Sequence, residues 1–145
     1  MKNRLAIIVG LFVAFTITSC SLSDLLGDKS LGGGYYLWKE GKDGQSNCIL
    51  LSTTERYKGT GLIVIPPTVI RTKHNKKVIL VLSQNFQSHE KEYWMINKET
   101  PIDLDICVDK KSCDSVLKSN VLGPLSYEDF INITMTKGIK LELEG

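Results

Sequence analysis

The stretch Val78-Ile79-Leu80-Val81-Leu82 is apolar at every position and is followed by the polar pair Ser83-Gln84. A strand that exposes one face to water alternates apolar and polar residues, whereas a continuous apolar run is typical of a strand covered on both faces. We therefore expect this stretch to be a central strand. The segment 68–73 precedes it, and the residues His74-Asn75 between the two predict the turn of a β-hairpin.

The rest of the chain, taken outward from this hairpin, predicts further strands and two short helices. Pro66-Pro67 should end the strand before the hairpin, because proline lacks a backbone donor. Ser126 is followed three positions later by Asp129, which indicates a capped helix over about 126–136, and a second short helix is possible over 114–120. We expect an α+β domain, mainly an antiparallel sheet of five to seven strands with one or two short helices near the C-terminus. The further strands fall at about 34–40, 46–52, 62–65, 92–97 and 139–143.

The N-terminus has the features of an export signal. Lys2 and Arg4 precede a mostly apolar run, Leu5 to Ile17, which is too short to be a comfortable membrane span. The four residues that end at Cys20, Ile-Thr-Ser-Cys, resemble the lipobox of bacterial lipoproteins. The resemblance implies cleavage before Cys20 and fatty acyl chains, such as palmitate, on that cysteine. The alternative is an ordinary signal peptide in which Cys20 is a disulfide cysteine or a bystander.

On this interpretation the chain has three parts. Residues 1–19 form the signal peptide, residues 20–34 a lipidated tether that ends in three glycines, and residues 35–145 one globular domain. The membrane partner is reached through the lipid on Cys20, and two or more acyl chains hold a protein stably at a bilayer.

Charge argues against a nucleic-acid partner. The formal charge of +2 comes from Lys2 and Arg4, so the rest of the chain is neutral and lacks the basic footprint of a nucleic-acid-binding protein. One basic cluster remains, and the sequence favours the solvated tip of a hairpin over an anion site for it. The cluster is Arg71, Lys73, His74, Lys76 and Lys77.

Three further cysteines follow Cys20. Cys107 and Cys113 enclose a short polar segment and could form a disulfide in an exported protein. The alternatives are two unpaired thiols, or a bridge from Cys48 to either of them.

The sequence offers no catalytic constellation, and we expect no enzymatic activity, metal site or cofactor. His74 and His89 both fall in predicted turns or loops, and Ser88-His89-Glu90 are adjacent residues that cannot form a catalytic triad from one loop. Asp103, Asp105 and Asp109 lack the spacing of a calcium-binding loop, so they are expected on a solvated face.

Aromatic residues supply the alternative hypothesis of ligand binding. Trp38 and Trp94 fall on two predicted strands, each beside a tyrosine, so neighbouring rings should point to opposite faces. One set should be in the core. The other could be exposed and bind a partner or a sugar ring.

The order of features resembles small lipoproteins of unknown function from Gram-negative gut bacteria. The lipobox, Gly34-Tyr35-Tyr36, Ile65-Pro66-Pro67, the segment 93–98 and Gly123-Pro124-Leu125-Ser126 carry this resemblance. It implies a location in the cell envelope, lipid-anchored, with the outer membrane favoured, and it implies no site. The sequence thus predicts a membrane-anchored binding or accessory module that contacts another envelope protein. The alternative is a domain that binds glycans or small ligands, or, less favoured, a hydrolase.

Overall fold

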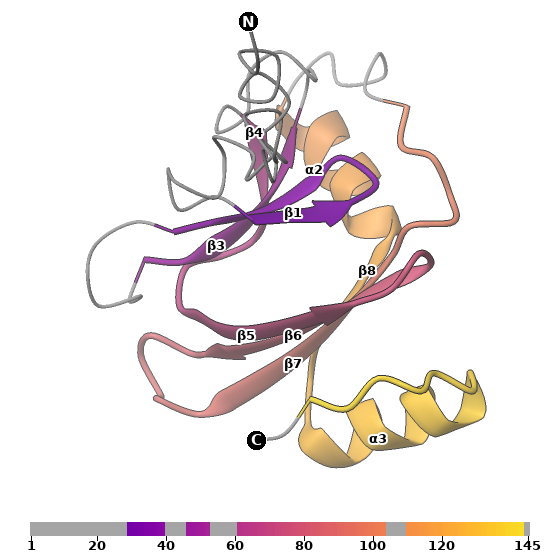
Figure 1. Ribbon diagram of the computed structural model, residues 1–145. Helices are drawn as coiled ribbons and strands as arrows, with labels where there is room; N and C mark the ends of the chain where they lie inside the picture. The colour runs from indigo at the N-terminus through magenta and orange to yellow at the C-terminus, as the bar shows by residue number, and fades with distance from the viewer. Residues whose placement is uncertain (1–28, 40–45, 53–60, 104–109, 144–145) are drawn as a thin grey trace, which may run out of the picture.

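The computed structural model describes residues 29–39, 46–52, 61–103 and 110–143 (Figure 1). Within these residues the chain forms mainly antiparallel strands, with two short helices near the C-terminus, so the predicted fold class is confirmed. The strands are β1 Lys29–Gly32, β2 Tyr35–Trp38, β3 Cys48–Ser52, β4 Gly61–Ile65, β5 Val69–His74, β6 Val78–Gln84, β7 Lys91–Asn97 and β8 Val121–Leu125, and the helices are α2 Lys110–Ser119 and α3 Tyr127–Thr136.

The strands divide between two sheets instead of forming one. Each sheet has four strands that pair in the order of the sequence: β1-β2-β3-β4 in the first sheet and β5-β6-β7-β8 in the second. The division falls at Pro66-Pro67, between β4 and β5, where the sequence predicted the end of a strand. Beyond the prolines, the backbone N–H groups of Thr68 and Val69 donate to the carbonyl of Asn47, which joins the two sheets at this corner.

Strand β6 is central, as its apolar run predicted. It pairs with β5 on one side and β7 on the other, and all its residues except Gln84 are buried. Ile79 and Val81 belong to the core that includes first-sheet residues, whereas Leu80 and Leu82 belong to the core that includes α3. Both faces of the strand are therefore covered, which explains why the run from Val78 to Leu82 is apolar at every position.

The first core lies between the two sheets. Leu31, Ile49 and Ile65 from the first sheet meet Ile79 and Ile96 from the second, and all five side chains are fully buried. Partly buried residues pack at its margin, among them Val64, Trp94 and Ile102.

The second core lies between the second sheet and α3, so the domain has three layers (Figure 1). Phe130 of α3 is buried, and its ring centroid lies 5.1 Å from that of Tyr93 on β7. Ser126 caps α3 as predicted, because its hydroxyl accepts from the backbone N–H of Asp129.

The range 20–34 differs from the sequence-based expectation in two respects. Strand β1 comes from the range 20–34 that was predicted as a tether, and Leu31 within it is fully buried. Gly32 to Gly34 form the β1–β2 turn of the folded domain and not a linker.

The prediction of a C-terminal strand over 139–143 is also wrong. These residues join no ladder, although Ile139, Leu141 and Leu143 pack against the second core with the predicted alternation of burial. Gly123-Pro124, expected between elements, lies inside the edge strand β8. Among the residues described, no helix is long and apolar enough to cross a membrane.

Candidate functional site

The two ends of the second sheet carry different side chains and are the candidate binding surfaces. In the β6–β7 pair, Val78 lies opposite Asn97 at one end and Gln84 lies opposite Lys91 at the other. A strand of seven residues spans about 24 Å, which is roughly three Debye lengths at physiological salt. The two ends therefore interact with charged partners nearly independently. We call them the basic end and the Phe86 end.

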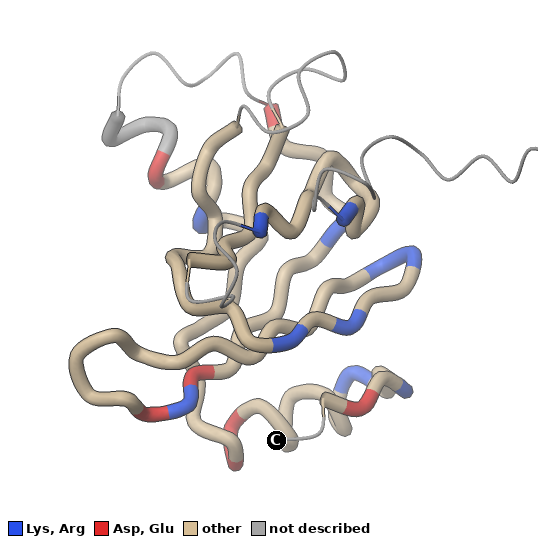
Figure 2. Tube along the Cα trace, turned by 60° about the vertical axis from the view of Figure 1, so that its left-hand side comes forward, with Lys and Arg blue, Asp and Glu red and all other residues tan. Residues whose placement is uncertain are grey.

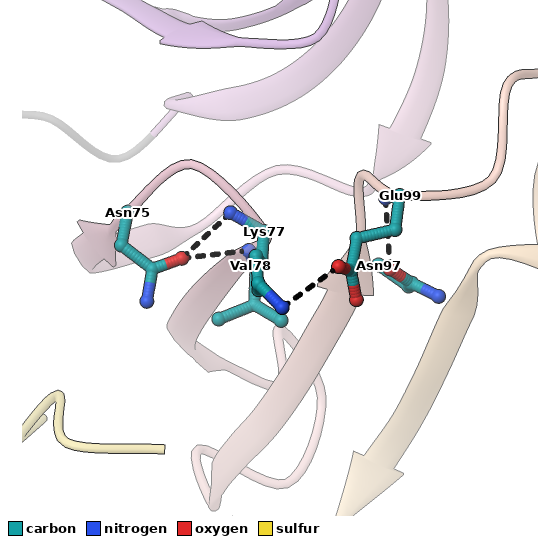
Figure 3. Close-up of polar contacts among 5 residues, drawn as sticks. All are labelled: Asn75, Lys77, Val78, Asn97 and Glu99. Atoms are coloured by element: carbon teal, nitrogen blue, oxygen red, sulfur yellow. Dashed lines mark hydrogen bonds and ion pairs between the residues drawn. The ribbon is translucent and has the colours of Figure 1, made fainter.

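The basic end is formed around the β5–β6 turn. The side-chain oxygen Oδ1 of Asn75 accepts from the backbone N–H groups of Lys77 (2.8 Å) and Val78 (2.9 Å), which fixes the turn (Figure 3). The Lys77 ammonium forms an exposed ion pair of 3.0 Å with Glu99. The hairpin from Val69 to Gln84 contains no Asp or Glu, and its cationic or titratable side chains are Arg71, Lys73, His74, Lys76 and Lys77.

Two lysines from outside the hairpin add to this charge. The Nζ of Lys98, just after β7, donates to the carbonyl oxygen of Leu31 at 2.6 Å and so links the two sheets. Its stem lies over the β1–β2 turn, where a Cβ on Gly33 would approach Lys98 Cδ to 3.2 Å. Lys29 is the first residue of β1, and its charge acts on His74, which places it near this end of the sheet.

The pKa shifts agree with this concentration of charge. Burial lowers the pKa of His74 below its ordinary value, and the charges of Lys98 and Lys29 lower it further. Burial also lowers the pKa of Lys98. Both shifts favour the uncharged forms because burial removes water from the charged group, and at His74 the two lysine charges add to this effect.

Two grooves flank the basic end. One of about 550 Å³ is lined by Arg71, Lys73, Lys140, Leu141 and Glu142. The other, of about 400 Å³, lies at the β1–β2 turn and is lined in part by Gly33, Ser52, Lys98 and Thr100. Figure 2 shows Lys and Arg positions gathered along one side of the domain, from the edge of the first sheet to the hairpin and the C-terminal segment.

The Phe86 end is formed by the β6–β7 loop, which is held by its own hydrogen bonds. The Oδ1 of Asn85 accepts from the N–H groups of Gln87 (2.9 Å) and Ser88 (3.0 Å), and the Asn85 amide donates to Glu92 (2.8 Å). The backbone of Asn85 exchanges two further bonds with residues across the loop, donating to Glu90 O and accepting from His89 N–H. The loop is therefore a defined structure, although the sequence showed only a polar segment.

This loop presents Phe86 to solvent. The side chain is 82% exposed, the highest value among the exposed large apolar residues described. It lines a pocket of about 560 Å³ together with Pro66, Pro67 and Thr68 of the corner between the sheets.

A second groove lies beside it, with acidic and aromatic residues. It has a volume of about 690 Å³, and Tyr127, half-exposed at the start of α3, lines it with Glu90 and Glu92. The Tyr127 ring centroid lies 5.4 Å from that of Tyr93. The next residues of α3, Glu128 and Asp129, add negative charge at this end.

The two predicted aromatic residues are not brought together. Trp38 lies on β2 of the first sheet and Trp94 on β7 of the second, and both are half-buried. The Nε1–H of Trp94 donates to the hydroxyl of Ser83 at 2.8 Å, and its ring packs against the first core. Trp94 thus also contributes to the fold, and a glycan-binding role for Trp38 and Trp94 stays a prediction.

Most of the predicted cysteine chemistry lies outside the described residues. Cys20 and Cys107 fall there, and Cys113 lies in α2 at a position whose side chain is not described, so the lipid attachment and the Cys107–Cys113 disulfide stay predictions. Cys48 is buried in β3. In the described part of the chain, no group of three or more His, Cys, Asp or Glu side chains could hold a metal ion.

Comparisons with known proteins give no relative. No family model, no curated protein and no solved structure matches this chain. The basic end, the Phe86 end and their grooves are therefore the observations from which a function can be argued.

Proposed function

We propose that this protein is a membrane-tethered binding domain of the cell envelope, which recruits a partner protein through its Phe86 end. The observation that carries the proposal is Phe86 itself, a large apolar side chain held 82% exposed by an ordered loop. A flexible loop could fold such a ring against the protein, whereas the hydrogen bonds of Asn85 hold the backbone on either side of it.

The energetics suit an interface. Burying a Phe side chain contributes about 1.5–3 kcal/mol, and in this chain that free energy is still available to a partner. Because the loop is already ordered, association costs little additional entropy in that segment. Binding hot spots are typically large side chains of this kind in well-packed pockets.

The surroundings of Phe86 define the chemistry of the partner. Pro66 and Pro67 extend the apolar contact, and Glu92 lines the same pocket. Glu90 lies in the adjoining acidic groove. We propose a partner surface with an apolar pocket flanked by Lys or Arg side chains, since complementary charge at the rim increases the association rate and suppresses wrong partners.

The tether in this proposal is the lipid on Cys20, which rests on the Ile-Thr-Ser-Cys sequence at residues 17–20. The test is to replace Cys20 with Ala and fractionate cells. Loss of the protein from the membrane fraction supports lipidation. Retention of the variant with the membrane contradicts it.

The partner proposal is tested by Phe86→Ala, with Met135→Ala as the matched control, because Met135 is 74% exposed on α3. Full-length protein is captured from crosslinked cells, the recurring envelope protein is purified, and its affinity for each variant is measured. We expect Phe86→Ala to weaken binding by about 10–100-fold and Met135→Ala to leave it unchanged. Equal affinities for wild type and Phe86→Ala would overturn the proposal.

A further inference from the structure

We infer that the basic end binds the surface of an anionic phospholipid bilayer, so that the anchored domain stands with this end against the membrane and Phe86 directed away from it. The inference deepens the proposed function and rests on its lipid anchor. It adds an orientation and a second contact with the membrane that involves no acyl chain.

The tether joins the domain at Lys29, the first residue of β1. Residues 21–28 connect Cys20 to Lys29, and even fully extended they span no more than about 30 Å. Lys29 lies close enough to His74 for its charge to lower the pKa of that imidazole. Two residues further on, Leu31 accepts the hydrogen bond from Lys98. Lys29 pairs with Leu37, so the tether brings the whole domain within reach of the bilayer, and the charges of the two ends decide which of them faces it.

The basic end carries positive charge on exposed side chains. Lys73 and Lys76 are exposed on a hairpin that contains no carboxylate. Among the described residues, carboxylates that lie near these cations are Glu99, which pairs with Lys77, and Glu142, which lines the groove with Arg71 and Lys73. Each lysine close to an anionic leaflet increases binding roughly fivefold, so Lys73 and Lys76 together are enough to bias an anchored domain.

The Phe86 end carries charge of the opposite sign. Glu90 and Glu92 line the groove beside Phe86 together with Lys91, and Glu128 and Asp129 begin α3 there, so these acidic residues outnumber the lysine. An anionic surface repels this end while it attracts the basic end. Lys76 and Lys77 at the β5–β6 turn lie about a strand length, roughly three Debye lengths, from Glu90, so the two effects do not cancel there. The net charge of residues 20–145 is zero, but positive and negative side chains are concentrated at opposite ends of the second sheet.

The experiment uses the lipidated protein, purified from membranes and reconstituted in two kinds of vesicle. One contains phosphatidylcholine alone, and the other contains about 30% phosphatidylglycerol. Flotation of the vesicles reports whether the lipid anchor holds. Lysine acetylation, read by mass spectrometry, then reports which side chains the membrane covers. Failure of the anchor and failure of the orientation are therefore separate results.

We expect Lys73 and Lys76 to be acetylated several-fold more slowly on phosphatidylglycerol vesicles than on neutral ones. Lys39 and Lys91 are exposed lysines at the other ends of β2 and β7, and we expect their rates to be the same on both. Equal rates at Lys73 on the two kinds of vesicle, or slower acetylation of Lys91, would overturn the inference.

Two double variants matched in net charge give the second measurement, read at Lys140, which lines the groove with Lys73. Lys73→Gln with Lys76→Gln should reduce the docking constant about 25-fold, taking roughly fivefold for each lysine, and abolish the protection of Lys140. Lys39→Gln with Lys91→Gln makes the same change in net charge and should leave that protection intact. Equal effects of the two pairs would show that net charge alone acts. Loss of protection on adding inorganic phosphate at constant ionic strength would assign the basic end to a phosphate ligand instead of a bilayer.

Discussion

Gly123 allows a stringent test of how β8 packs on β7. It lies in β8 with a φ of 138°, and an added Cβ would lie 2.7 Å from Cε3 of Trp94 and 2.8 Å from the carbonyl oxygen of Tyr93. The oxygen belongs to the backbone of a central strand pair and cannot move as a flexible side chain can. Gly123→Ala therefore combines an unfavourable backbone conformation with a steric clash.

The magnitude follows from these two costs. A non-glycine residue in such a conformation costs of order 1–3 kcal/mol, and overpacking a filled site costs about 1–3 kcal/mol more. We expect Gly123→Ala to lower the free energy of unfolding by about 2–6 kcal/mol. Gly138→Ala is the control, because Gly138 has a φ of 62° but no atom within 4 Å of an added Cβ. It should cost only the left-handed conformation, about 1–2 kcal/mol.

The assay is urea unfolding followed by tryptophan fluorescence, since Trp94 is one of only two tryptophans in the chain. The slope of the transition checks that both variants unfold in the same way as the wild type. If Gly123→Ala is no more destabilising than Gly138→Ala, β8 does not approach Trp94 as described. The placement of Trp94 in the fold would then be wrong.

Four other substitutions test separate parts of the structure by the same unfolding assay. Lys98→Met keeps the apolar stem but removes the donor to Leu31, and should cost about 1.5–3 kcal/mol; a change within 0.5 kcal/mol would contradict the link between the sheets. The pKa of His74 is lower in the folded state than in the unfolded state, so the unfolded state binds the proton more readily and stability falls as the pH drops below about 6.5. His74→Gln should therefore reduce the loss of stability between pH 7.5 and 5.5. Identical slopes of stability against pH for the wild type and His74→Gln would refute the shift. Phe130→Ala should cost about 3–5 kcal/mol because the ring is buried, whereas Phe86→Ala should stay within about 0.5 kcal/mol, and similar losses from both would contradict their assigned burial.

Periodicity and capping predicted the elements whose signals are local. The apolar run 78–82 predicted the central strand, and Ser126 with Asp129 predicted the start of α3, because burial on both faces and a helix cap each leave a direct pattern in sequence. The residues 139–143 show the limit of this reasoning. Their alternation predicted burial correctly, but alternating burial does not require a hydrogen-bonded neighbour, and here the segment packs without one.

The features that define the candidate surfaces depend on tertiary contacts. Gly32 to Gly34 have the composition of a linker, and contacts from far along the chain fix them as a turn: the stem of Lys98 lies over Gly33, and the N–H of Ser52 donates to the carbonyl of Gly34. Phe86 is a single apolar residue in a polar loop, and its exposure depends on hydrogen bonds of Asn85 that residue spacing does not reveal. The division into two sheets likewise depends on the corner at Pro66-Pro67, which the sequence could locate only as the end of a strand.

Site-specific photocrosslinking of the full-length protein in cells tests the central claim, which is that the Phe86 end recruits a protein partner. A photoreactive phenylalanine analogue is placed at Phe86, and in separate strains at Met135 and Lys76. We predict that position 86 crosslinks one recurring envelope protein, and that positions 135 and 76 do not capture it. Crosslinking of the same protein from all three positions, or from none, would contradict the account.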